Sequence, residues 1–167
     1  MMNISREMIG AGILIDTCGV AKPGEKLVIA TDQEKMDIAN IIAEACLSRK
    51  IEPVIISMIP RKSHGEEPPM PYAATLKKAD IVFAATSFSI FHTNARIEAC
   101  NKGTRWVNLP GYSRKMLREG GLFVDFHKQR EKAEKIGKIL SEGNSVQVVT
   151  DKGTNITFTV KGRDAIV

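Results

Sequence analysis

The chain has 167 residues, of which 43% are hydrophobic and 26% are charged, as is ordinary for one soluble globular domain or one half of a two-domain protein. The net charge of +5 comes from basic residues interleaved with acids, as in residues 128–135, which argues against a nucleic-acid-binding surface. No run of about 18 apolar residues and no signal-peptide pattern is present, which argues against a membrane span and against secretion.

Cysteine usage points to a reducing compartment. The three cysteines, Cys18, Cys46 and Cys100, are scattered, so they do not form a disulfide framework or a C-x-x-C zinc pair. We expect reduced, buried and inert thiols, which favours a cytoplasmic location.

The first predicted element is a helix over residues 4–18, with Ser5 as its cap and with Met8, Ile9, Ile13 and Cys18 available to a core. Its Gly10-Ala11-Gly12 run lacks the preceding strand and the third glycine of a dinucleotide fingerprint. The glycines therefore indicate close packing of the helix.

A β-α-β unit follows. Leu27–Ala30 is a continuous apolar run, which predicts a strand buried on both faces. Thr31-x-x-Glu34 reads as a capping box for a helix that extends to about Arg49. Pro53–Ile59 predicts a second buried strand, joined to the first by a right-handed crossover.

Residues 60–71 form the longest irregular segment, in which four prolines exclude both helix and central strand. The segment carries Arg61, Lys62, His64, Glu66 and Glu67 just beyond the carboxyl end of a strand. It can be a ligand-binding loop, a solvated connector or an arm that packs on a second subunit.

The remaining elements complete an α/β pattern. We expect a helix over 72–79, a strand over 81–85, a helix from Thr93 to Lys102, a strand over 105–109, a short helix capped by Ser113, a long amphipathic helix over 125–142 and a hairpin of 145–150 with 155–160. The predicted fold is α/β in three layers, with a mainly parallel four-stranded sheet flanked by helices and a C-terminal antiparallel β-hairpin. The predicted domains are a Rossmann-like domain at 1–143 and, at 144–167, the hairpin with the start of a connection to a further half.

The junction between the third strand and the next helix, residues 84–96, is the first candidate site. It offers Ser87, His92 and Arg96 at the carboxyl end of a strand, where open α/β sheets bind ligands. A hydroxyl, an imidazole and a guanidinium suit an anionic or carbonyl-bearing ligand. The alternative is structural: Ser87 and Thr93 cap the helix, His92 satisfies a backbone carbonyl and Arg96 forms a surface ion pair.

Common catalytic constellations are absent from the sequence. There is no G-x-S-x-G elbow, no G-x-x-x-x-G-K-[ST] loop and no H-E-x-x-H motif. His64, Glu66, Glu67 and His92 are ligand types for zinc, but three histidines in the chain are few for a complete site. The sequence therefore indicates a binding crevice without a catalytic set.

Several motifs occur in an order that resembles a known family. The chain resembles the amino-terminal half of the leucyl aminopeptidase (aminopeptidase T-like) metallopeptidases, and the ring-opening dihydroxypyridine dioxygenases look like more distant relatives. The resemblance covers nearly the whole chain and rests on the segments Cys18–Lys26, Pro60–Pro69, Thr86–Arg96, Asn108–Gly111 and Gly153–Phe158.

The resemblance implies a two-half enzyme about twice as long as this chain. In that family the metal ligands lie in the carboxyl-terminal half, after the equivalent of Gly162-Arg163, so none is carried over to a residue here. The resemblance implies no metal on this chain and a divalent metal of the zinc, cobalt or iron class in the missing half. By itself, this 167-residue chain is expected to be an inactive excised domain or a natural short form.

Under this reading the chain forms one wall of the substrate cleft of a metal-dependent aminopeptidase-like hydrolase. His92 and Arg96 hold a carboxylate or carbonyl of a small peptide or small-molecule substrate, and Ser87 adds a hydrogen bond. His64 and Glu66, with Arg61 as a further candidate, contact the substrate or the partner half. A homo-oligomer is expected, without nucleic-acid or membrane partners.

Three alternatives stay open at this point. The chain can be a stand-alone module that binds a small molecule or nucleotide without catalysis. It can be the N-terminal domain of a ring-opening non-haem iron dioxygenase. It can also be an oligomerisation domain whose proline-rich loop is the swapped arm.

Overall fold

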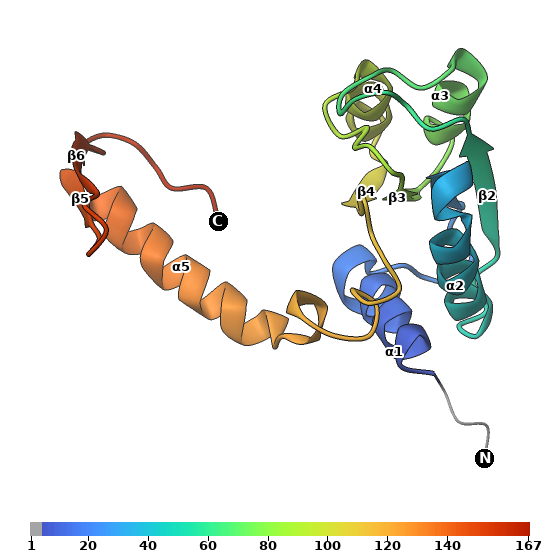
Figure 1. The fold of residues 1–167 in the computed structure, drawn as a ribbon, viewed down its shortest axis with the longest axis horizontal. Helices are drawn as coiled ribbons and strands as arrows, with labels where there is room; N and C mark the ends of the chain where they lie inside the picture. Colours follow the sequence, from blue (N-terminus) through green and yellow to red (C-terminus); the bar gives the residue numbers. More distant parts are fainter. Residues whose placement is uncertain (1–4) are drawn as a thin grey trace. The chain divides into compact units, whose positions relative to one another are not determined.

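The computed structural model describes residues 5–167, and the chain divides into two compact units after Phe123 (Figure 1). The first unit holds a parallel sheet with helices α1–α4, and the second holds helix α5 and a β-hairpin. The α/β fold with a four-stranded parallel sheet and a C-terminal antiparallel hairpin is confirmed. The sequence placed residues 125–142 with the first domain, whereas this helix here shares a unit with the hairpin; the division into 1–143 and 144–167 stays a prediction.

The sheet of the first unit has the strand order β2-β1-β3-β4, and all of its strand pairs are parallel. The strands are β1 (Leu27–Asp32), β2 (Pro53–Met58), β3 (Ile81–Ala85) and β4 (Arg105–Asn108). Every residue of β1 and β3 is buried, as their apolar runs predicted.

Strand β2 differs from its prediction as a second buried strand. It lies at an edge of the sheet, and the Val54 side chain is 53% exposed. An apolar run predicts a strand but does not show its place in the sheet. At an edge, a strand has no neighbouring strand on one side, so part of it stays exposed.

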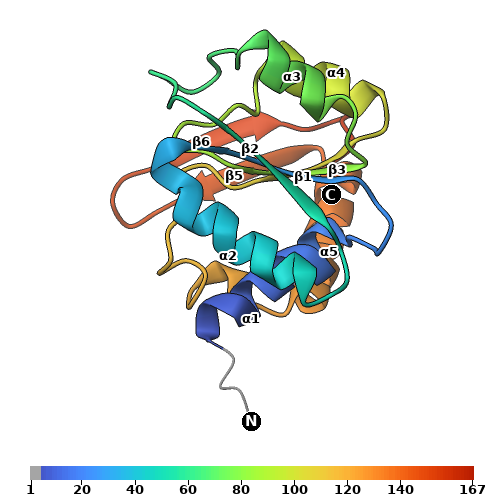
Figure 2. The same cartoon turned by 90° about the vertical axis from the view of Figure 1, so that its right-hand side faces the viewer.

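Helices cover both faces of the sheet (Figure 2). Helices α1 (Arg6–Ile13) and α2 (Met36–Leu47) lie on one face, and α3 (Met70–Leu76) and α4 (Asn94–Asn101) lie on the other. Short turns of 3-10 helix occupy Gln33–Lys35 and Gly121–Phe123. On the α3–α4 face, Val28 and Val82 of the sheet share one buried cluster with Leu76 and Ala99 of the helices.

Helix α1 confirms the Ser5 cap, whose hydroxyl oxygen accepts a hydrogen bond from the Met8 N–H at 3.3 Å. A π-helical turn over Leu14–Gly19 extends the helix. Gly10 and Gly12 are both buried, and a β-carbon at Gly10 would overlap the backbone oxygen of Leu117. Close packing through the glycines is therefore confirmed.

The predicted core residues of this helix need correction. Ile9 is 49% exposed and Cys18 is exposed, while Leu14 and Ile15 are buried in their place. The small residues Gly10, Ala11 and Gly12 take the buried positions of α1, and Ile9 is left on the exposed side. The expectation that all three thiols are buried is accordingly wrong for Cys18.

Two predicted helix starts differ from the structure. Thr31 belongs to β1 and its hydroxyl donates to the Ala85 carbonyl at 2.8 Å, so Asp32 caps the following 3-10 turn in its place. Residues 114–118 form turns, not the expected short helix, although the Ser113 carbonyl accepts a hydrogen bond from the Leu117 N–H. In both places the sequence contains residue types that cap helices, but it does not show where the helical turn begins or whether it continues.

The second unit consists of α5 (Phe126–Glu142), capped by Asp125, and the antiparallel strands β5 (Ser145–Val149) and β6 (Asn155–Thr159). These elements match the predicted helix and hairpin. Gly137 is the one buried residue from Val124 to Val167, so this unit has almost no core of its own.

Candidate functional site

The chain order reverses between β1 and β3, because β2 lies on one side of β1 and β3 lies on the other. At such a topological switch point, α/β proteins commonly bind ligands beyond the carboxyl ends of the two strands. β1 ends with Asp32, and β3 is followed by Thr86 and Ser87. The structure therefore places an acid and a hydroxyl group at this position.

Asp32 is fully buried and ties these two strand ends together. Its Oδ2 accepts a hydrogen bond from the Ser87 N–H at 2.6 Å, and its Oδ1 accepts from the Ser87 hydroxyl at 2.9 Å and from the Glu34 N–H at 3.1 Å. The neighbouring Tyr72 hydroxyl donates to the Thr31 carbonyl at 3.0 Å. Burial, and then the nearby charge of Asp32, raises the pKa of Tyr72, so this phenol stays protonated.

Ser87 Oγ lies between two carboxyl groups, at 2.9 Å from Asp32 Oδ1 and 3.1 Å from Glu34 Oε2. A hydroxyl group has a single proton to donate, so it cannot satisfy both acceptors at once. The carboxylate oxygens of Asp32 and Glu34 beside Ser87 can therefore accept further hydrogen bonds. This arrangement suits the donor groups of a ligand, such as an amine or hydroxyl, better than it suits an anion.

The proline-rich loop is joined to the junction by backbone and imidazole contacts. His64 Nδ1 accepts a hydrogen bond from the Ser89 N–H at 2.9 Å, and the Gly65 N–H donates to the Ser89 carbonyl at 2.8 Å. The neutral His64 ring therefore carries its proton on Nε2. These contacts place the proline-rich loop beside the segment that follows β3, and its role in ligand binding stays a prediction.

The two acids of the loop have structural partners. Glu67 caps helix α4, since its carboxylate accepts hydrogen bonds from the Asn94 and Ala95 N–H groups. Glu66 accepts from the Lys62 N–H at 2.7 Å and lies 3.6 Å from the Arg61 guanidinium. These contacts hold the loop in one conformation beside α4.

His92 and Arg96 both lie on Phe91. His92 is exposed, with its ring edge-on to Phe91, and Arg96 stacks over the same ring at 4.3 Å. Arg96 Nε also donates to the Phe91 carbonyl at 2.8 Å, and Thr93 caps α4 as predicted. Among residues 5–167, no hydrogen bond joins Ser87 to His92 or Arg96.

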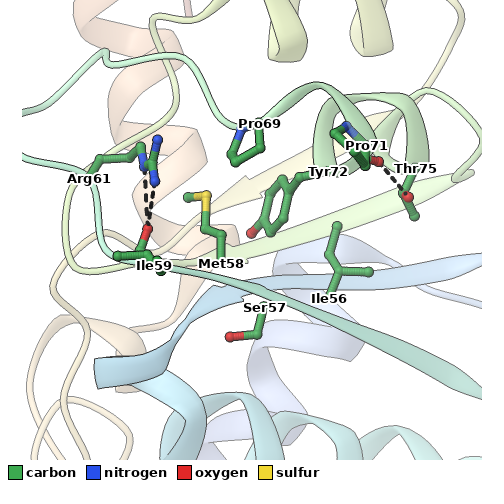
Figure 3. A pocket seen from close by; sticks show the side chains of 9 residues that line it. All are labelled: Ile56, Ser57, Met58, Ile59, Arg61, Pro69, Pro71, Tyr72 and Thr75. Carbon is green, nitrogen blue, oxygen red and sulfur yellow. Dashed lines mark hydrogen bonds between the residues drawn. The ribbon is translucent and has the colours of Figure 1, made fainter.

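Arg61 lines a separate cavity of about 430 Å³ between β2 and α3 (Figure 3). The wall consists of residues from the end of β2, the proline-rich loop and the start of α3: Ile56, Ser57, Met58, Ile59, Pro69, Pro71, Tyr72 and Thr75. The sequence singled out Arg61 but not this cavity.

Sequence reasoning missed Asp32 and Glu34. The available signal was an acid two residues after the apolar run 27–30, beyond the carboxyl end of a predicted strand. The capping-box pattern places the cap at Thr31 and Glu34 in the first turn of the helix, so it predicts a structural role for this segment.

The described residues do not offer a metal site or a membrane span. Within residues 5–167, no group of three or more His, Cys, Asp or Glu side chains is arranged to hold a metal ion. In the same part of the chain, no helix combines the length and apolarity needed to cross a membrane.

Comparison with known proteins shows similarity in fold. No protein-family profile and no curated protein sequence matches the chain. The structure of 2,5-dihydroxypyridine dioxygenase from Pseudomonas putida KT2440 matches 93% of this chain with a TM-score of 0.70 and 14% identity. The structure of AmpT from Thermus thermophilus matches 92% with a TM-score of 0.54 and 12% identity.

The two solved structures correspond to the two enzyme groups that the sequence motifs resemble. This chain spans 48% of the dioxygenase and 53% of AmpT, which is about half the length of each. At this level of identity, the likeness establishes a shared fold.

Proposed function

We propose that this chain is the amino-terminal, substrate-cleft half of a two-half metal-dependent enzyme, with an aminopeptidase-like hydrolase as the first candidate. The observation that carries the proposal is the fold match, which covers nearly all of this chain but only about half of each neighbour. The order of the sequence motifs supports the same assignment.

In this proposal the metal belongs to the other half. The described residues do not fit a divalent metal, because they lack a group of three suitable ligands. A carboxyl-terminal half would supply a metal of the zinc, cobalt or iron class, which polarises the scissile carbonyl and activates water. Assembly into a homo-oligomer and a cytoplasmic location belong to the same proposal.

The residues of this chain would then bind and orient the substrate. Ser87, whose hydroxyl donates to Asp32 Oδ1 at 2.9 Å, would accept a hydrogen bond from the substrate. His92 and Arg96 hold a substrate carboxylate or carbonyl from the exposed end of the junction, and His64, Glu66 and Arg61 contact the substrate or the other half. The amino group of a peptide would match the spare acceptors beside Ser87.

The amino-terminal half of a ring-opening dioxygenase is the second candidate. It is favoured by the better superposition, with a TM-score of 0.70 against 0.54. The stand-alone binding module is the third, supported by the cavity beside Arg61.

The test uses the protein purified from its own host. We expect a mass about twice the 18.3 kDa of this chain and hydrolysis of aminoacyl anilides that is abolished by a chelator and restored by zinc or cobalt. Replacing both His92 and Arg96 by Ala should lower kcat/KM at least tenfold.

Three other results would contradict parts of this proposal. Ring opening of a dihydroxypyridine with ferrous iron, without peptide hydrolysis, would select the dioxygenase. A mass near 18.3 kDa with neither activity would overturn the two-half proposal in favour of a binding module. An unchanged kcat/KM in the double variant would remove His92 and Arg96 from the site.

A further inference from the structure

The cavity between β2 and α3 is distinct from the cluster around Asp32 and Ser87. It lies at the carboxyl end of the edge strand, and its volume of about 430 Å³ is in the range of small-molecule sites. We infer that this cavity binds a small apolar molecule that carries a single carboxylate group.

The walls of the cavity are mostly apolar. Ile56 and Met58 of β2 face Pro69 and the Tyr72 ring across the cavity (Figure 3). Proline restricts the backbone, and Tyr72 is held by its hydrogen bond to the Thr31 carbonyl. The site is therefore largely preformed, which lowers the entropic cost of ligand binding.

Arg61 supplies the charged end. Its guanidinium lies at one end of the cavity, and its side chain is only 19% exposed (Figure 3). Nε and Nη2 donate to the Ile59 carbonyl at 3.3 and 3.1 Å, which fixes the direction of the guanidinium. Arginine has five N–H donors, so Nη1 and part of Nη2 remain available for a carboxylate.

Glu66 modulates this charge. Its Oε1 lies 3.6 Å from Arg61 Nη1, which is an ion-pair contact but too long for a hydrogen bond. Its Oε2 is already held by the Lys62 N–H at 2.7 Å. A ligand carboxylate would thus compete with Glu66 for the guanidinium, and neutralising Glu66 should strengthen ligand binding.

The other polar groups of the cavity wall offer few hydrogen bonds to a ligand. The Thr75 hydroxyl donates to the Pro71 carbonyl at 3.0 Å, and the Tyr72 hydroxyl donates to Thr31, so neither donor is directed to a ligand. The Ser57 side chain lies on the opposite face of β2 from Ile56 and Met58, so its hydroxyl group is not directed into the cavity (Figure 3). One cationic end and an apolar body favour a monocarboxylate over a sugar or a nucleotide.

The experiment titrates the 167-residue chain with hexanoate and, as a neutral probe of the same shape, with hexanamide. Binding is followed by two-dimensional amide NMR. We expect hexanoate to shift the signals of Ile56, Met58 and Thr75, with at least tenfold weaker binding of hexanamide. Arg61→Gln should weaken hexanoate binding about tenfold or more, and Glu66→Gln should strengthen it.

Controls separate the site from non-specific charge effects. Lys62→Gln removes the adjacent exposed cation and should leave the affinity within about twofold. Thr75→Trp fills the cavity and should abolish binding, which tests the site even where Arg61→Gln alters the fold. Equal binding of both probes, no binding at millimolar concentration, or full binding by Thr75→Trp would overturn the inference.

Discussion

At the scale of single residues, the buried carboxylate of Asp32 links the two central strands. It accepts hydrogen bonds from the backbone and hydroxyl of Ser87 and from the Glu34 N–H. A buried carboxylate is tolerated when several donors surround it. Asp32 therefore positions Ser87 and also stabilises the fold.

Asp32→Ala should lower the free energy of unfolding by about 2–4 kcal/mol, because it leaves the Ser87 N–H without its acceptor and removes a cap. Urea denaturation measures the loss. Asp37→Ala, an exposed acid in the first turn of α2, serves as the matched control and should change stability by less than about 0.5 kcal/mol. Similar losses in both variants would contradict the role of Asp32.

The cysteines should differ in reactivity. Burial raises the pKa of the Cys46 thiol to about 11, while Cys18 is exposed, with a pKa that partial burial raises. At pH 8, only about one in a thousand Cys46 thiols would be ionised, and access is blocked as well. Mass spectrometry after iodoacetamide treatment should find Cys18 modified first and Cys46 modified only in urea; early labelling of Cys46 would contradict its burial.

At the scale of elements, two buried glycines of α1 set how closely the helix packs. Gly10 lies against the backbone of Leu117, whereas Gly12 lies against the end of the flexible Arg49 side chain. Arg49 is itself paired with Asp16 at 2.7 Å. The same substitution at the two glycines should therefore have different effects.

Gly10→Ala should destabilise the protein by about 1–3 kcal/mol, because a backbone group cannot move aside as readily as a side chain. Gly12→Ala should cost less, since the guanidinium can move and alanine favours the helix. Thermal unfolding of the two variants makes the comparison. Equal melting temperatures would show that the contact with Leu117 does not constrain α1.

The turn before β1 contains an acid whose effect depends on pH. The hydrogen bond from Arg105 at 2.7 Å, with a further one from the Lys22 N–H, lowers the pKa of Glu25. Because the pKa of Glu25 is lower in the folded state, its ionised carboxylate stabilises the fold fully at neutral pH. This stabilisation is lost as the pH falls through the folded-state pKa, which lies below 4.5. Glu25→Gln should thus cost roughly 0.5 kcal/mol at pH 7 and progressively less as the pH is lowered below 4.5; a cost that does not fall in acid would contradict the ion pair.

At the scale of the whole chain, the two units differ in burial. The first has the fully buried strands β1 and β3, whereas the second exposes Ile139 to 70% and Val149 to 64%. A two-stranded hairpin without a covering layer is only marginally stable in water.

Amide hydrogen exchange should therefore be slowest in β1 and β3 and fastest in β5 and β6, with α5 between them. Mass-spectrometric exchange on the 167-residue chain measures this order. Protection of the hairpin equal to that of β1 would show that the second unit is stabilised by contacts beyond its own core.

Much of the fold could be predicted because the signals are local. Helix and strand periods, and the caps at Ser5 and Thr93, depend on residues a few positions apart. The apolar runs of β1 and β3 belong to the same class. The candidate site was partly visible too, since Ser87 follows a recognisable strand.

The tertiary structure alone decided which distant residues meet. The strand order left β2 at an edge, brought Asp32 to Ser87 across 55 positions of sequence and placed Arg61 at a cavity. Such pairings depend on how whole elements pack, and no short-range pattern records them. The sequence by itself determined the elements and their order, and packing determined which side chains share a site.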